Sequence, residues 1–231
     1  HVSSRRQRQM CIRDRHNELS IGYDTAVDVA TNALDMLQPT AASHRRVMIL
    51  EVMGRDAGHI ALNAGIAGGA DVILIPEIQY SIKSIADHIE KLRSKGRNHA
   101  LIVVAEAVKK ENGKKATVKY VDGEVRLGGI GNYLGDEIYK ITDSETRVTV
   151  LGHVQRGAQP THRDRLIASA FGVYAVDLIA KKKFNRVVVW KDRGVQDLML
   201  SQVAGYSKTV QKNDPLIKVA EGLGIYIGET N

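Results

Sequence analysis

Runs of apolar residues alternate with helical patterns along most of this chain. The apolar runs lie at residues 47–52, 72–76, 101–106, 147–152 and 186–190. They are continuously apolar rather than alternating, which is the pattern of strands buried on both faces of a parallel sheet. We therefore predict a strand at each run.

Helical spacing fills the intervals between these runs. The predicted helices lie near residues 57–68, 81–95, 130–140, 163–181 and 214–223. A further helix, with its apolar face between Ala26 and Leu37, precedes the first strand, and Pro39 is predicted to end it. This alternation predicts a doubly wound α/β fold, with mostly parallel sheets and helices on both faces.

The interval from Ala107 to Tyr139 departs from this alternation. It contains the lysine-rich stretch 109–119, interpreted as a solvated loop, and the dipeptide Asp122-Gly123. Asp-Gly is a strong signal for a two-residue hairpin turn, and short β-prone segments flank it. We expect a small hairpin there.

The net charge of +7 is concentrated at the start of the chain. Residues 1–15 hold five arginines and one aspartate, a net of +4, so the other 216 residues carry only +3. The first fifteen residues have no apolar period, and we interpret them as a basic tail that looks non-native, which leaves residues 16–231 as the folded part. A disordered tail explains them better than a nucleic-acid-binding arm.

The composition indicates a cytoplasmic protein. The chain is 43% hydrophobic, enough for a core, but no window reaches the roughly 18 apolar residues that span a membrane. No secretory segment follows the basic start. The single cysteine, Cys11, excludes an internal disulfide. We expect a cytoplasmic location, with neither a membrane nor nucleic acid as partner.

Polar and charged residues follow several of the predicted strands. Parallel strands bring their carboxyl ends to one edge of the sheet, where ligands of open α/β folds bind. Arginine presents a fork that matches phosphate oxygens, and a helix N-terminus beside it adds free N–H donors. The edge is therefore predicted to bind a phosphorylated metabolite. The residues that reach it are Met53, Gly54, Arg55, Glu106, His153, Gln155, Arg156 and Gly157.

Each of these residues has a plainer explanation when it is taken singly. Arg55 alone could be a surface residue, and His153 alone is more often a hydrogen-bonded core histidine than a ligand contact. Glu106 could pair with a neighbouring arginine. Their joint arrival at one edge favours the binding site.

Four segments together resemble the phosphofructokinase family: EVMGRDAGHIAL, GGADVILIPE, VVAE and ETRVTVLGHVQRGAQPTHRDRLIAS. The resemblance runs from about Leu19 to Ile227. It implies a phosphofructokinase-like fold and transfer of a phosphoryl group from ATP to the 1-hydroxyl of fructose 6-phosphate, which gives fructose 1,6-bisphosphate in glycolysis. Two alternatives stay open: pyrophosphate as the donor, or a non-catalytic paralogue that binds sugar phosphate.

The resemblance also implies roles for individual residues. Residues 53–55 would contact the sugar, and Arg55 would also reach the phosphoryl group in transfer. Glu106 would bind a sugar hydroxyl. His153 and Arg156 would hold the 6-phosphate.

Four other basic residues match positions near the family's subunit interfaces and regulatory pocket. Arg46 and Arg147 resemble arginines that a neighbouring subunit contributes to the same phosphate. They imply a homodimer or homotetramer with the sugar site across an interface. Lys95 and Arg97 resemble basic residues of the regulatory pocket, where Gln38 replaces an arginine that is often seen.

The family's nucleotide part has no counterpart here. Its Gly-Gly-Asp loop, its magnesium aspartate and the Thr-Ile-Asp-Asn-Asp segment with the catalytic base would all precede Ile21. We therefore expect the chain to be truncated and inactive alone. The ligands of Mg²⁺ are expected in the missing N-terminal part, with no metal site in this chain.

Overall fold

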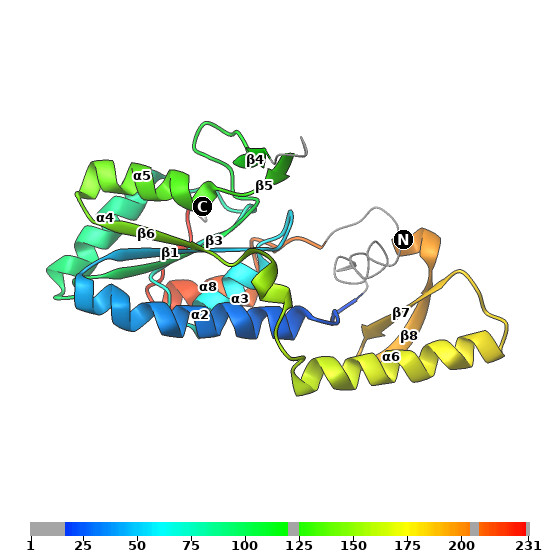
Figure 1. Ribbon diagram of the computed structural model, residues 1–231. Coiled ribbons are helices and arrows are strands. Elements are labelled where there is room, and N and C mark those ends of the chain that lie inside the picture. The colour runs from blue at the N-terminus through cyan, green and yellow to red at the C-terminus, as the bar shows by residue number, and fades with distance from the viewer. Residues whose placement is uncertain (1–16, 120–124, 204–207, 230–231) are drawn as a thin grey trace. The chain divides into compact units, whose positions relative to one another are not determined.

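The structure is a computed structural model, and the basic tail, residues 1–15, lies outside the residues that it describes (Figure 1). So does the Asp122-Gly123 turn. The described residues are 17–119, 125–203 and 208–229.

The chain divides into two compact units. The larger unit takes Val27–Gln155 and Thr209–Asn231. The smaller unit takes the described residues of His1–Ala26 and Arg156–Lys208. Each unit is described by itself below.

A four-stranded parallel sheet forms the centre of the larger unit. All three of its strand pairings are parallel. Every residue of its first three strands along the chain is buried, which confirms the reading of continuously apolar runs as strands covered on both faces. The strands are β1 (Val47–Val52), β2 (Val72–Leu74), β3 (Ala100–Ala105) and β6 (Thr146–Val150), in the order β2-β3-β1-β6.

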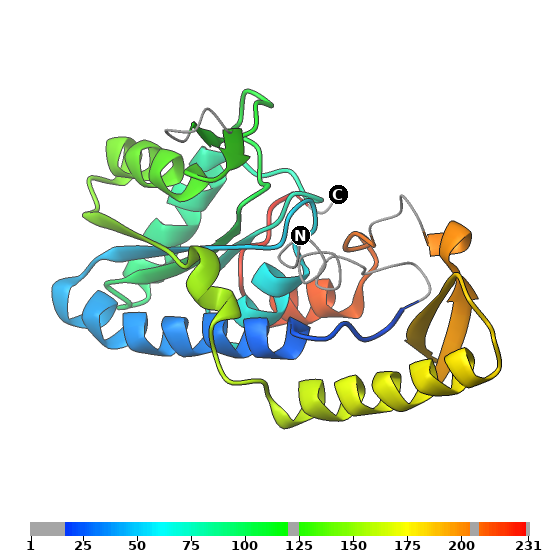
Figure 2. The ribbon, with the colours of Figure 1, turned by 45° about the vertical axis from the view of Figure 1, so that its right-hand side comes forward.

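Helices cover both faces of this sheet, which confirms the predicted α/β fold. One set of helices lies over one face and a second set over the other (Figures 1 and 2). The first set is α2 (Tyr23–His44), α3 (His59–Ala67) and α8 (Pro215–Gly222); the second is α4 (Ile82–Ser94) and α5 (Ile130–Thr142). The largest fully buried side chains include Leu34, Ile49 and Ile102.

The two strands of the predicted hairpin are present. β4 (Thr117–Lys119) pairs antiparallel with β5 (Val125–Leu127), and Thr117 lies opposite Leu127. The lysine-rich stretch before it forms a tight turn, in which Gly113 donates its N–H to the Lys110 carbonyl at 2.8 Å.

Helix α2 continues past the proline that was predicted to end it. The helix reaches His44, with Pro39 inside it. Ala41, fully buried, packs with Met48 and Leu101. The prediction was wrong because this packing outweighs the hydrogen bond that proline removes.

The smaller unit contains α6 (His162–Ala180), an antiparallel pair formed by β7 (Arg186–Lys191) and β8 (Gly194–Met199), and the short helix α7 (Leu200–Val203). The run at 186–190 is therefore a strand, but the prediction that it joins the parallel sheet was wrong. Asp192 and Arg193 have φ angles of 51° and 62°, so they form a tight two-residue turn that returns the chain beside β7.

A buried aspartate ties this unit together. Asp164, 2% exposed, accepts hydrogen bonds from the N–H groups of Gly22 and Thr25, both at 2.9 Å. The first turn of α2 is thereby satisfied by a side chain of α6.

Gly58, which precedes α3, allows a close approach between chain segments. A Cβ at this position would lie 2.3 Å from the Cβ of Ile75 and 2.9 Å from a carboxylate oxygen of Glu77. We predict that Gly58→Ala lowers the free energy of unfolding by roughly 1–3 kcal/mol, because the crowded segments must shift. Urea unfolding measures this change.

Gly172, inside α6, provides the matched control. No atom lies within 4 Å of a Cβ built there. Gly172→Ala should raise the free energy of unfolding by roughly 0.5–1 kcal/mol, because alanine favours helix. Destabilisation of similar size in both variants would show that the close approach at Gly58 is not the cause.

Candidate functional site

The chain turns sharply where the central strand β1 ends. Side chains from the segments that follow β3 and β6, the two strands beside β1, hold the turn by hydrogen bonds. The Met53 N–H donates to Oε1 of Gln155 at 2.9 Å. The N–H groups of Gly54 and Arg55 both donate to Oε1 of Glu106, at 3.1 and 2.8 Å. Three successive backbone donors are thus satisfied by two side chains.

Arg55 has a backbone conformation that is unusual for a residue with a side chain. Its φ is 53°, in the left-handed region. Its side chain is exposed at the carboxyl edge of the sheet. The turn therefore presents a guanidinium group where the sequence predicted an anion-binding arginine.

Glu106 lies directly after β3 and is half-buried. Its N–H donates to the carbonyl of Val52 at 2.9 Å, which fixes the residue to the end of β1. Oε1 serves the turn, and no described residue donates a hydrogen bond to Oε2. This second oxygen is available to accept a further hydrogen bond.

The 3-10 helix η1 (Gly152–Arg156) follows β6 at the same edge. His153 is exposed on it, while Gln155 is buried at 1% exposure. Arg156 is half-exposed and is the first residue of the smaller unit's second segment. Within the larger unit, the structure thus brings His153, Glu106 and residues 53–55 to one edge.

Glu51 is a buried carboxylate for which the sequence predicted no role. It is 2% exposed, in the middle of β1, and accepts from Gly129 and Gly131 N–H groups at 3.0 and 2.9 Å. It therefore caps the N-terminus of α5, where donors lack helical partners. The signal in the sequence was a carboxylate inside the apolar run VMILEV.

Burial raises the pKa of the Glu51 carboxyl above its ordinary value, and the nearby Glu106 acts in the same direction. The folded state thus binds this proton more tightly than the unfolded state. As pH rises from the unfolded pKa to the folded pKa, wild type should lose stability relative to Glu51→Gln, which does not titrate. Urea unfolding between pH 4 and 8 measures the difference.

An exposed glutamate serves as the control for this prediction. Glu90→Gln on α4 removes a carboxylate that is exposed and pairs with Arg93 at the surface, so it controls for the loss of a glutamate elsewhere in the unit. A stability difference between wild type and Glu51→Gln that is constant over this pH range would contradict the prediction.

Glu77, after β2, binds the backbone at the start of α3. The Gly58 N–H at the start of α3 donates to its two oxygens at 3.0 and 3.2 Å. The Val210 N–H donates to Oε1 at 2.8 Å. A carboxylate of the same chain thus binds the Gly58 N–H, so this one donor is not available to an anion beside Arg55.

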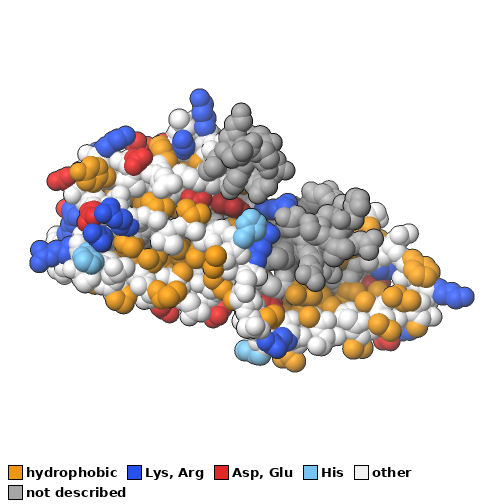
Figure 3. All heavy atoms as spheres, in the orientation of Figure 1, with side chains coloured by type: hydrophobic (Ala, Val, Ile, Leu, Met, Phe, Trp, Pro, Cys, Tyr) orange, Lys and Arg blue, Asp and Glu red, His pale blue; other side chains and the backbone are white. Residues whose placement is uncertain are grey.

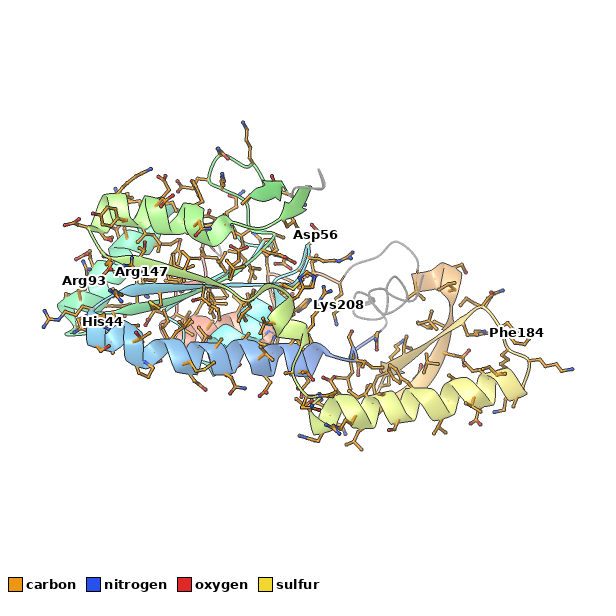
Figure 4. The ribbon with its side chains drawn as sticks, viewed as in Figure 1. His44, Asp56, Arg93, Arg147, Phe184 and Lys208 are labelled. Carbon is orange, nitrogen blue, oxygen red and sulfur yellow. The ribbon has the colours of Figure 1, made fainter. Side chains whose placement is uncertain are left out.

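Arg46 and Arg147 lie at the other end of the sheet. Arg46 Nε contacts Glu145 Oε2 at 2.7 Å, and Arg147 contacts the other oxygen of Glu145. Figure 4 shows Arg147 and Asp56 at opposite ends of the sheet, and Figure 3 shows basic side chains gathered at the Arg147 end. At about 3.3 Å per residue, β1 separates the two ends by roughly 17 Å.

This separation bears on the expected role of the two arginines. Neither can contact an anion held beside Arg55 in the same copy of the chain. Their assignment to the phosphate therefore requires a second copy, as the sequence resemblance implies.

Arg97 and Lys95 differ in their surroundings. A terminal nitrogen of Arg97 contacts Asp71 Oδ1 at 2.9 Å, and Asp71 is only 5% exposed. The other oxygen of Asp71 accepts from the Leu101 N–H at 2.8 Å. Lys95 is exposed at the end of α4. Arg97 thus already forms an ion pair with a buried carboxylate, whereas Lys95 is exposed.

The described residues contain neither a candidate metal centre nor a candidate membrane span. In those residues, no group of three or more His, Cys, Asp and Glu side chains could hold a metal ion. No helix within 17–119, 125–203 and 208–229 is both long and apolar enough to cross a bilayer.

Comparisons with known proteins agree on one family. The family described as Phosphofructokinase matches residues 15–179. An ATP-dependent 6-phosphofructokinase 1 of Nostoc sp. is 56% identical over 92% of this chain and 59% of its own length. An ATP-dependent 6-phosphofructokinase of Chloroflexus aurantiacus is 43% identical over 91% of this chain and 58% of its own length.

Solved structures agree on the fold. A pyrophosphate-dependent phosphofructokinase from Nitrosospira multiformis superimposes with a TM-score of 0.76 at 20% identity, over 96% of this chain and 59% of that one. The phosphofructokinase of Saccharomyces cerevisiae gives 0.69 at 26% identity, over 93% of this chain and 26% of that one. This chain spans about three fifths of the length of the curated relatives named above.

Proposed function

This chain belongs to the phosphofructokinase family, and we propose that it is the sugar-phosphate-binding part of a 6-phosphofructokinase. In the proposed reaction, a phosphoryl group passes from ATP to the 1-hydroxyl of fructose 6-phosphate, and fructose 1,6-bisphosphate is the product. The observation that carries the proposal is the braced turn at Met53–Arg55, which presents an arginine beside a carboxylate oxygen that can accept a hydroxyl.

ATP is the proposed donor because the curated relatives at 43–56% identity are named ATP-dependent. The pyrophosphate-dependent neighbour is only 20% identical, so its likeness concerns the fold alone. Pyrophosphate stays the alternative donor.

The proposed roles follow the chemistry of each side chain. Arg55 stabilises negative charge on the phosphoryl group in transfer, since phosphoryl transfer depends mainly on positioning and charge stabilisation. Oε2 of Glu106 accepts from a sugar hydroxyl. His153 and Arg156 hold the 6-phosphate. Together they place the 1-hydroxyl beside the guanidinium group.

Mg²⁺ is the proposed cofactor of the complete enzyme. It supplies positive charge to the phosphates in this class of reaction. The described residues offer no cluster of three or more ligating side chains for it. We propose that its ligands and the general base belong to a part of the full-length protein that this chain does not contain, so that the chain alone is inactive.

The surface of α6 supports the proposal of a further part. Leu166, Val173 and Val176 on this helix are 68%, 67% and 64% exposed. Exposed apolar side chains gathered on one helix are typical of a surface that another segment covers. A non-catalytic paralogue that binds sugar phosphate is the alternative function.

The proposed assembly is a homodimer or homotetramer in the cytoplasm. Its support is the resemblance of Arg46 and Arg147 to arginines that a neighbouring subunit contributes, since the length of β1 separates both from Arg55 within one copy. The proposed effector role of Lys95 and Arg97 would require Arg97 to exchange Asp71 for a ligand anion.

Calorimetric titration of the 231-residue chain tests the proposed substrate. The chain should bind fructose 6-phosphate and should not bind fructose, because the phosphate supplies the charged contacts. His153→Ala should weaken binding of fructose 6-phosphate roughly tenfold. His162→Ala, at an exposed histidine that begins α6, is the control. Equal binding of fructose and fructose 6-phosphate would contradict the proposal.

A further inference from the structure

Gln155 has none of the roles proposed above, yet it is the most buried side chain at the site. It is 1% exposed and belongs to η1. Its amide accepts from the Met53 N–H at 2.9 Å and donates to the Met53 carbonyl at 3.4 Å. One side chain thus pairs with both backbone groups of one residue, which an amide can do because it carries both an acceptor oxygen and donor N–H groups.

The turn after β1 is braced from both sides. Gln155 reaches it from η1, after β6, and Glu106 reaches it from the end of β3. Arg55 has a left-handed backbone, which costs energy for any residue other than glycine. Such a conformation persists only where surrounding contacts fix it, and these two side chains supply hydrogen bonds to Met53, Gly54 and Arg55.

The position of Gln155 in η1 joins this brace to the proposed phosphate contacts. His153 lies two residues before Gln155 in the same short 3-10 helix. A hydrogen bond between Gln155 and Met53 therefore fixes the distance from His153 to the turn that presents Arg55.

We propose that Gln155 is a positioning residue that sets the separation between η1 and the Met53–Arg55 turn, and thereby the length of sugar phosphate that the site accepts. The ligand named here rests on the proposed function. The brace itself rests on the hydrogen bonds of a buried amide.

Gln155→Met is the variant that removes the bonding and keeps the volume. Methionine is unbranched and of similar length, so it fills the same space while it leaves both backbone groups of Met53 unpaired. The matched control is Gln159→Met, at an exposed glutamine four residues further along the chain.

Amide hydrogen exchange of the 231-residue chain tests the brace without any ligand. In Gln155→Met, the Met53 amide should exchange roughly tenfold faster, and those of Gly54 and Arg55 should follow. Ile49 and Ile102, inside β1 and β3, should keep their protection. Unchanged exchange at Met53 would overturn the brace. Equal acceleration at Ile49 would show a merely structural role and would also overturn the proposal.

Titration with two ligands tests the positioning role. Fructose 6-phosphate spans η1 and the turn, whereas inorganic phosphate contacts η1 alone. Gln155→Met should therefore raise the Kd for fructose 6-phosphate roughly tenfold and change the Kd for inorganic phosphate less than about twofold. Equal weakening of the binding of both ligands would show that Gln155 only supports the structure of η1, and it would overturn the positioning role.

The two experiments separate this inference from the proposed function. If the wild-type chain binds neither fructose 6-phosphate nor inorganic phosphate, the proposed function fails. In that case, amide exchange at Met53 alone decides whether Gln155 braces the turn.

Discussion

In the complete enzyme, Arg55→Ala should lower kcat by a hundredfold or more and change KM for fructose 6-phosphate little. The physical reason is that a contact made mainly in the transition state appears in kcat. Loss of one such charged contact in a desolvated site costs roughly 3 kcal/mol. Steady-state kinetics with a coupled assay for fructose 1,6-bisphosphate measures both constants.

Arg193→Ala is the matched control for this change. Arg193 is also exposed and also has a left-handed backbone, with a φ of 62°, but it lies in the β7–β8 turn. Its replacement should leave kcat within about twofold of wild type. If Arg55→Ala keeps normal turnover, Arg55 is a surface residue.

Arg147→Ala and Arg156→Ala should each raise KM for fructose 6-phosphate, because both are proposed to contact the 6-phosphate. A hydrogen bond to a charged group is worth roughly 1.5–3 kcal/mol, which corresponds to a rise of roughly 10- to 150-fold. The two variants differ in which copy of the chain would supply the arginine. KM of each purified variant is the first measurement.

Mixing the two variants tests where the arginines act. If a partner subunit supplies Arg147, each mixed dimer has one site with both arginines and one site with neither. Random assembly then restores about a quarter of the sites to wild-type affinity. Each variant unfolded and reassembled with itself is the control. No restored sites in the mixture would contradict the assignment of Arg147 to a neighbouring subunit.

The sequence predicted the fold of the larger unit well because its signals are local and strong. The continuously apolar runs at 47–52 and 101–106 became buried neighbouring strands of one parallel sheet. The two errors have tertiary causes. Pro39 stayed inside α2 because Ala41 packs against the sheet, and β7 turned back on β8 through two residues with positive φ.

The candidate site was predicted in its location but not in its internal bonding. The order of the strands brings Arg55, Glu106 and His153 to one edge, as expected for the carboxyl ends of parallel strands. Burial and backbone bonding were not readable from the sequence. No pattern in the sequence predicts that Glu51 caps α5 or that Gln155 pairs with Met53.

The measurement that tests the central claim most directly is product formation by a chimera. The part of the Nostoc 6-phosphofructokinase that has no counterpart here would be joined to this chain, which is 56% identical to the remainder. With ATP and fructose 6-phosphate, the chimera should form fructose 1,6-bisphosphate, the chimera with Arg55→Ala should form at least a hundredfold less per second, and this chain alone should form none. A folded chimera that binds both substrates and forms no product would contradict the account, and product from pyrophosphate but not from ATP would contradict the proposed donor.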